Sequence, residues 1–128
     1  MTDSGTYAIT VRTVFAASHA LRLANGDSEP LHGHNWDVLA EVSTTDLDRM
    51  QAVMDFHDVQ NALADILKPW NNRHLNDCPP FVDGTLNPTA ERVAWAIAQQ
   101  LIAAMPEGVQ VTSVAVGEAP GCTAIYRP

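Results

Sequence analysis

The chain has 128 residues and a formal net charge of −8, with 46% hydrophobic and 17% charged residues. This length can bury the core of one domain without disulfide or metal staples, so we expect a single domain over residues 1–128. The acidic balance argues against nucleic acid and anionic membranes as partners, because a protein that neutralises phosphates needs a basic patch.

The first part of the chain predicts two strands joined by a long connection. Residues 1–7 are polar, without a basic stretch followed by an apolar one, and no apolar run is long enough for a bilayer, so we expect a cytoplasmic protein. Residues 7–15 alternate as a strand does, and residues 33–44 form a second alternating run. The segment between them loses the alternation and ends in turn residues, which is typical of a long hairpin loop.

The rest of the chain predicts two helices and a second hairpin. Residues 56–67 have helical spacing between Asp55, a plausible N-cap, and Pro69. A second helix is expected over residues 87–105, with Asn87 as its cap, and strands are expected over residues 109–116 and 123–127. The order ββααββ predicts an α+β fold, a four-stranded antiparallel sheet with two helices on one face. The segment 70–86 is too long for a mere connection, and such loops are often functional.

Two histidines at the start of the second strand, in the stretch LHGHNW, indicate a metal site. Side chains two apart in a strand share a face, with Cβ atoms about 6.5–7 Å apart, so His32 and His34 can reach one ion. His19 ends the stretch FAASH, and antiparallel pairing would bring it beside them. Three neutral imidazoles with an open fourth position form the ligand set of a catalytic zinc site. An HxH pair alone is more often a pair of loop histidines, but the third histidine favours metal binding. Cys78 and Cys122 lack the spacing of a zinc–thiolate site.

The chain resembles the family of 6-pyruvoyl-tetrahydropterin and 6-carboxy-tetrahydropterin synthases over nearly its whole length. The motifs are FAASH, LHGHNW, MDFHDVQ, HLND, NPTAE and VAVGE…AIYR, in the order and spacing of the family. The resemblance implies a tunnelling fold assembled as a homohexamer, a dimer of trimers. It also implies that His19, His32 and His34 hold Zn²⁺, which grips the hydroxylated side chain of a dihydropterin, and that Glu118 anchors the pterin ring. A carboxylate can accept two parallel hydrogen bonds from a 2-amino-pyrimidinone edge; without the resemblance, Glu118 would be taken for a solvated turn residue.

The chain departs from the family at the positions that move protons. Family members usually carry a cysteine four residues before the HGH motif, where this chain has Ser28, and a serine hydroxyl is a far weaker base. One branch instead uses a glutamate three residues before the motif, and Glu29 fits it as the acid/base; in that branch the resemblance implies cleavage of the side chain of 7,8-dihydroneopterin triphosphate. The Asp-His pair of the family is replaced by Asn71 and Asn72, which neither give nor take protons near neutral pH. His74 is a second catalytic candidate, with Asp77 as an alternative to it.

Three functions remain open from these residues. The first is a zinc-dependent pterin lyase or synthase-like enzyme that uses Glu29 on 7,8-dihydroneopterin triphosphate or a close relative, by side-chain cleavage or elimination. The second is a zinc- and pterin- or purine-binding module without the usual reaction, since Ser28, Asn71 and Asn72 all depart from the family. A third is a zinc hydrolase in which Glu29 activates a metal-bound water. The kept metal and pterin positions support ligand binding better than the ordinary reaction, and the kept Glu118 counts against the third function. We favour the first.

Overall fold

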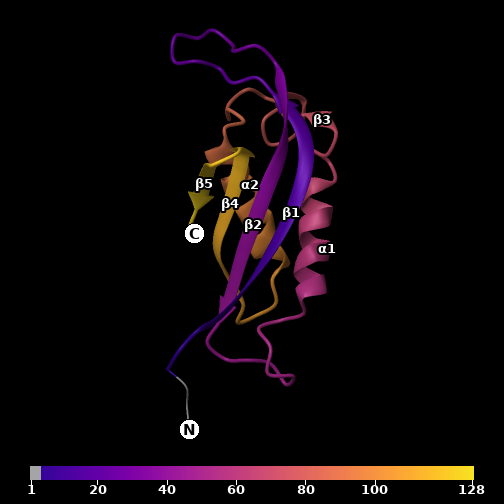
Figure 1. The fold of residues 1–128 in the computed structure, drawn as a ribbon, viewed down its shortest axis with the longest axis vertical. Coiled ribbons are helices and arrows are strands. Elements are labelled where there is room, and N and C mark those ends of the chain that lie inside the picture. The colour runs from indigo at the N-terminus through magenta and orange to yellow at the C-terminus, as the bar shows by residue number, and fades with distance from the viewer. Residues whose placement is uncertain (1–3) are drawn as a thin grey trace.

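The computed structural model describes residues 4–128, which form a single sheet backed by two helices (Figure 1). Within these residues the sheet has five strands in the order β3-β1-β2-β4-β5. The α+β class and the antiparallel packing of β1, β2, β4 and β5 are confirmed. The bounds are β1 (Tyr7–His19), β2 (His32–Thr44), α1 (Phe56–Leu67), β3 (Arg73–His74), the 3₁₀ turn η1 (Leu75–Asp77), α2 (Ala90–Ala104), β4 (Gln110–Ala119) and β5 (Cys122–Tyr126).

The hairpin of β1 and β2 forms the long axis of the molecule (Figure 1). It pairs from Tyr7 opposite Thr44 to His19 opposite His32, so β1 continues past the predicted end at residue 15. Alternate side chains of both strands are buried against the helices. The connection between the strands, residues 20–31, projects beyond the end of the sheet (Figure 1). The hairpin therefore places its histidines at the edge of the core.

Both helices lie on one face of the sheet, as predicted, with α1 against β1 and α2 against β4 and β5. The Asp55 carboxylate caps α1 by accepting a hydrogen bond from the His57 N–H. The predicted cap of α2 was wrong. Thr89 is the N-cap and accepts from the Arg92 N–H at 3.1 Å, whereas Asn87 hydrogen-bonds both backbone polar groups of Arg22. The Asn87 amide is therefore occupied by these tertiary hydrogen bonds and does not cap the helix.

The segment expected to be a loop, residues 70–86, contains two short elements. β3 adds a fifth strand parallel to β1, with Ala17 opposite Arg73 and Ser18 opposite His74. A two-residue strand has no periodicity that the sequence could show, and it forms because backbone and side chain at residues 71–72 bond to Ala16. Among residues 4–128, neither helix is long and apolar enough to cross a membrane.

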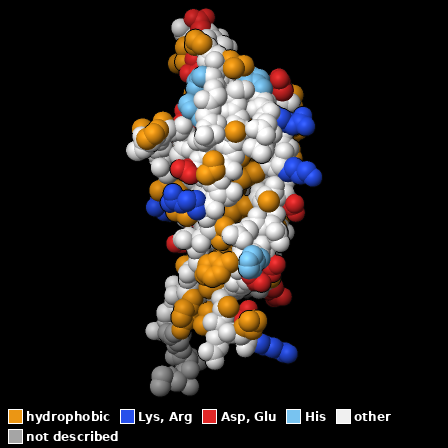
Figure 2. All heavy atoms as spheres, turned by 45° about the vertical axis from the view of Figure 1, so that its right-hand side comes forward, with side chains coloured by type: hydrophobic (Ala, Val, Ile, Leu, Met, Phe, Trp, Pro, Cys, Tyr) orange, Lys and Arg blue, Asp and Glu red, His pale blue; other side chains and the backbone are white. Residues whose placement is uncertain are grey.

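Basic side chains are scattered over the face of the molecule shown in Figure 2. On the face shown in Figure 2, the Lys and Arg side chains stand in separate places and form no continuous basic patch.

Candidate metal centre

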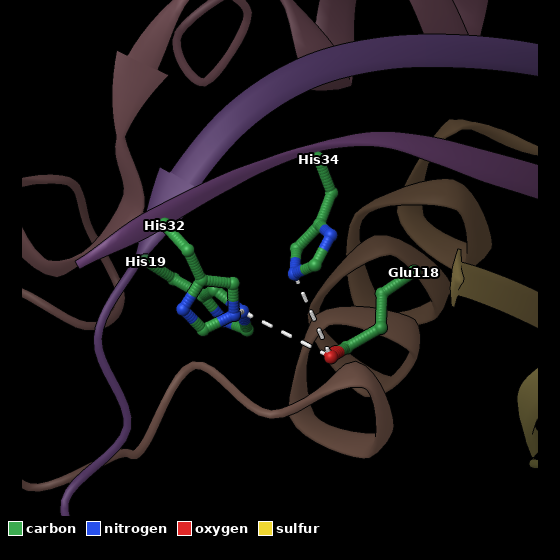
Figure 3. Close-up of side chains that lie close together, drawn as sticks. All are labelled: His19, His32, His34 and Glu118. Carbon is green, nitrogen blue, oxygen red and sulfur yellow. Dashed lines mark hydrogen bonds and ion pairs between the residues drawn. The ribbon is translucent and has the colours of Figure 1, made fainter. Parts of the chain in front are cut away.

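Three histidines from two strands converge on the helix-covered face of the sheet (Figure 3). His19 and His32 are paired directly across the hairpin, and His34 follows His32 on the same face. The ring centroids of His32 lie 4.6 Å from those of both His19 and His34. The structure therefore brings together the three residues that the sequence predicted as ligands.

Backbone carbonyls fix the orientation of two of these rings. His19 Nδ1 donates to the Pro88 carbonyl at 2.8 Å, and His32 Nδ1 donates to the Pro30 carbonyl at 3.0 Å. A carbonyl can only accept, so in each ring Nδ1 carries the proton and, in the neutral form, Nε2 presents a lone pair. The two Nε2 atoms lie 3.0 Å apart. Two lone pairs facing at this distance are unfavourable unless a cation is shared between them.

The third ring leaves a buried nitrogen without a partner. Within the described residues, His34 Nε2 is buried and makes no hydrogen bond. A buried polar atom of this kind calls for a ligand, a water or an ion. Burial lowers the pKa of the His34 imidazole, while the nearby Glu118 carboxylate acts in the opposite direction. The neutral ring that burial favours is the form that binds a metal.

Glu118 completes the group from a third strand. Its Oε1 lies 3.7 Å from His34 Nε2 and 4.0 Å from His19 Nε2. One donor atom from each of the four residues falls within 4.8 Å of all the others. The residues present therefore fit a metal ion held by three imidazoles and reachable by one carboxylate. The family resemblance had assigned Glu118 to the pterin ring, and the sequence analysis did not place it in the metal group.

Trp36 forms the floor of the site. It is fully buried, its indole N–H donates to the Ala17 carbonyl at 3.1 Å, and its ring lies edge-on to His19 with centroids 4.8 Å apart. A large rigid side chain beneath the imidazoles restricts their rotamers, which preorganises the ligand atoms.

A cavity of about 600 Å³ opens beside Glu118, within the range of small-molecule sites. It runs between the start of α2 and β5. Its lining is Leu21, Thr89, Ala90, Glu91, Glu118, Ala119, Cys122, Thr123, Ala124 and Ile125.

Glu29 lies on the outer side of His32. Its Oε1 is 3.7 Å from His32 Nδ1 and accepts a hydrogen bond from the Leu21 N–H at 3.1 Å. Ser28, in contrast, is exposed and forms an isolated bridge with Arg22, away from the imidazoles. Of these two neighbouring positions, the glutamate is the one that the structure brings to the metal group.

His74 is not brought to the group. Its Nδ1 lies 3.0 Å from Ser18 Oγ, and Ser18 alternates with His19 along β1, so the pair lies on the other face of the sheet. Asn71 and Asn72 bind the edge of β1: the Asn71 amide oxygen accepts from the Ala16 N–H at 3.0 Å, and the Asn72 N–H donates to the Ala16 carbonyl at 2.6 Å. Both asparagines hold the sheet edge in place.

Asn76 is a positioning residue that sequence reasoning missed. Its amide accepts from the Ala20 N–H at 2.9 Å and donates to the Ala20 carbonyl at 2.8 Å. The clamp holds the backbone directly after His19. The only signal in the sequence was its place within the stretch HLND.

Comparison with known proteins gives one consistent family. Residues 8–128 match the sequence model described as 6-pyruvoyl tetrahydropterin synthase. A probable 6-carboxy-5,6,7,8-tetrahydropterin synthase from Halobacterium salinarum is 31% identical, over 85% of this chain and 79% of that protein. The 6-pyruvoyl tetrahydropterin synthase of Caenorhabditis elegans superposes with a TM-score of 0.83 at 20% identity, covering 100% of this chain and 99% of that one. That of Plasmodium vivax gives 0.78 at 19% identity, covering 98% and 99%.

Proposed function

Because the chain belongs to the 6-pyruvoyl tetrahydropterin synthase family, we propose that it is a zinc-dependent lyase or synthase-like enzyme acting on a dihydropterin. The proposed substrate is 7,8-dihydroneopterin triphosphate or a close relative, and the proposed reaction is cleavage or elimination in its side chain. The proposal comprises a metal group, an anchor for the ring and an acid/base.

The convergence of three imidazoles carries the proposal. His19 and His32 present Nε2 lone pairs 3.0 Å apart, and His34 offers a buried unpartnered nitrogen beside them. Zinc prefers nitrogen ligands in a tetrahedral arrangement, and this set supplies three. A bound zinc would polarise the hydroxyl groups of the substrate side chain and ease their deprotonation.

The cavity beside Glu118 supports the ring anchor. A pterin presents adjacent N–H donors on its 2-amino-pyrimidinone edge, which match the two oxygens of a carboxylate. With the ring in this cavity, its side chain would extend toward the imidazoles, because Glu118 contacts both the cavity and His34.

We assign the acid/base role to Glu29. It lies 3.7 Å from His32 Nδ1 and is partly exposed, so a bound side chain could reach it. In the Plasmodium vivax synthase a glutamate is also a catalytic residue. His74 stays a prediction of the sequence: on this chain its imidazole is directed to Ser18, on the other face of the sheet.

A binding module without turnover is the second candidate function. The observation that favours it is the use of Asn71 and Asn72 to hold the backbone of Ala16, where the family carries proton-transferring groups. Such a module would bind zinc and a pterin or purine ligand and would be indifferent to the loss of Glu29.

One experiment separates the two. Zinc-loaded protein is incubated with 7,8-dihydroneopterin triphosphate and the products are identified by mass spectrometry, beside a chelated sample and the Glu29→Gln variant. A 6-hydroxymethyl, 6-carboxy or 6-pyruvoyl pterin that is absent from both controls supports the enzyme. Unchanged pterin returned from a zinc-loaded sample supports the binding module instead.

The proposal also includes a homohexamer. In the described chain β5 ends the sheet on one side, and on the other β3 covers only two residues of β1. Ring closure between such edges would satisfy their free backbone groups. Light scattering after size-exclusion chromatography measures the mass, and a monomer would contradict this part of the proposal.

A further inference from the structure

The Glu118 carboxylate lies where a fourth metal ligand would be. We infer that Glu118 binds the metal in the substrate-free protein and leaves it when a pterin ring takes up both of its oxygens. The inference rests on the metal centre of the proposed function and adds a second state to it. The ring anchor and the fourth ligand are then one side chain used at two stages.

The distances carry the first step. Ligands of a tetrahedral zinc with bonds of about 2.0–2.1 Å stand about 3.3 Å from one another. Here Glu118 Oε1 is 3.7 Å from His34 Nε2 and 4.0 Å from His19 Nε2, while the nitrogens of His19 and His32 are 3.0 Å apart. The three separations lie on both sides of the tetrahedral value. Each of these three separations is within an ångström of the tetrahedral value, and all four donor atoms lie within 4.8 Å of one another.

The backbone explains why the carboxylate is aimed there. Gly117 pairs with Thr123 and Ala119 with Cys122, so Glu118 is the extra residue of a bulge between β4 and β5. A bulge re-aims the side chain that it carries. Glu118 also follows Val114 and Val116 at a spacing of two, which places it on the helix-covered face with the imidazoles (Figure 3).

Competition between the two roles carries the second step. Glu118 belongs both to the metal group and to the lining of the 600 Å³ cavity. Accepting two parallel N–H donors from a pterin edge requires both carboxylate oxygens in one orientation. A carboxylate that ligates through Oε1 cannot hold that orientation as well. Binding of the ring therefore frees the fourth position, which catalytic zinc sites keep open for substrate.

Metal affinity tests the ligand role without any turnover. Zn²⁺ is titrated into metal-free protein in competition with a chelating dye, for the wild type, Glu118→Gln and Asp37→Asn. Asp37 lies opposite Gly117 but is exposed on the other face of the sheet, so its variant matches the charge change alone. We expect Glu118→Gln to bind zinc about tenfold or more weakly, since even outer-shell partners are worth about 10–100-fold. Equal affinities for Glu118→Gln and wild type would overturn the inference.

Cobalt spectra test the exchange. With Co²⁺ in the site, azide should change the visible bands of Glu118→Gln at concentrations that leave the wild type unchanged, because only the variant has an accessible fourth position. Adding unsubstituted pterin to the wild type should make it respond to azide as well. Azide binding to the ring-free wild type as tightly as to the variant would contradict the inference.

The outcomes also separate this inference from the proposed function. If His32→Ala binds zinc as tightly as the wild type, the metal centre itself is wrong and both fall. If only Glu118→Gln matches the wild type, the metal centre stands and the fourth ligand falls. A weakened Glu118→Gln in a protein that turns over no pterin would keep the inference and remove the enzyme.

Discussion

The two faces of the sheet differ at the end of the hairpin where His19 pairs with His32. On the helix-covered face, three histidines and Glu118 converge, and two of the rings are tied to carbonyl oxygens. On the other face lie Ser18 and Gly33, which alternate with the histidines along the hairpin. With His74 they line a hollow of about 550 Å³. One hydrogen bond joins Ser18 to His74 there. This contrast indicates that the groups orienting a histidine, and not its proximity along the sequence alone, decide whether it joins the candidate metal group.

The largest expected effect comes from removing one of the three imidazoles on the helix-covered face. In His32→Ala the partner of the His19 Nε2 atom is lost, and so is one of three imidazoles. We expect zinc affinity to fall by more than about a hundredfold, beyond the 10–100-fold that outer-shell partners contribute. Metal content after dialysis and competition with a chelating dye measure it.

A matched variant controls for the loss of a histidine as such. His57 lies at the start of α1 with an exposed ring beside Asp55. His57→Ala should keep full metal content. If both variants lost metal equally, the decrease would reflect general destabilisation and not the ligand set.

Local patterns predicted most of the fold, because the strands and helices repeat their burial with a fixed period. Alternation found β1 and β2, and spacing found α1 with its cap at Asp55. What failed depended on distant contacts. Asn87 was a good cap by type, but its amide hydrogen-bonds the backbone of Arg22 instead. The two residues of β3 pair with Ala17 and Ser18, which are distant in sequence.

The candidate site divides in the same way. His19, His32 and His34 followed from strand geometry, since pairing and alternation place them on one face. The alternation of Val114, Val116 and Glu118 agrees with the face that Glu118 occupies, but its approach to the rings depends on a bulge that the sequence does not mark. Asn76 was missed because an amide that clamps backbone groups has no spacing rule.

The clamp at Asn76 gives a smaller effect on the same face. Asn76→Ala leaves the backbone N–H and carbonyl of Ala20 without their amide partners. We expect a loss of about 1–3 kcal/mol in the free energy of unfolding, measured by urea denaturation of the metal-free protein. Because the clamp holds the residue after His19, zinc affinity should fall too, by up to about tenfold.

Asn87→Ala supplies the comparison for this clamp. Asn87 makes the same pair of backbone hydrogen bonds, but to Arg22, farther along the loop. It should cost similar stability with less effect on zinc. An equal loss of zinc affinity in both variants would show that Asn87 also orients the ring, through the neighbouring Pro88 carbonyl that accepts from His19 Nδ1.

The two cysteines should be alkylated at different rates, which depend on pH and on access to the cavity. Burial raises the pKa of the Cys78 thiol, so its reactive thiolate forms only at pH values above the usual range. Cys122 is exposed and lines the cavity beside Glu118. At mildly alkaline pH we expect iodoacetamide to modify Cys122 first, with Cys78 following only as pH rises further, as read by peptide mass spectrometry.

The same alkylation measurement with a bound pterin tests where the ring lies. If the ring occupies the cavity, it should slow alkylation of Cys122 and leave Cys78 unchanged. Alkylation of Cys122 at the same rate with saturating pterin would place the ring elsewhere.

The smallest effect is expected on the opposite face, at Gly33, which lies between His32 and His34 in the chain. A Cβ at Gly33 would meet only the Ala17 carbonyl oxygen, at 4.0 Å, which is ordinary contact, and it would point into the hollow with Ser18. Gly33→Ala and Ser18→Ala should therefore both keep zinc affinity within about twofold, since the added Cβ meets only the Ala17 carbonyl and the lost hydroxyl bonds to His74. A larger loss of zinc affinity in Gly33→Ala would mean that the backbone of β2 requires a glycine at this position, whatever the space beside it. A larger loss in Ser18→Ala would mean that the Ser18–His74 pair is coupled through the sheet to the metal, and the contrast between the two faces would fail.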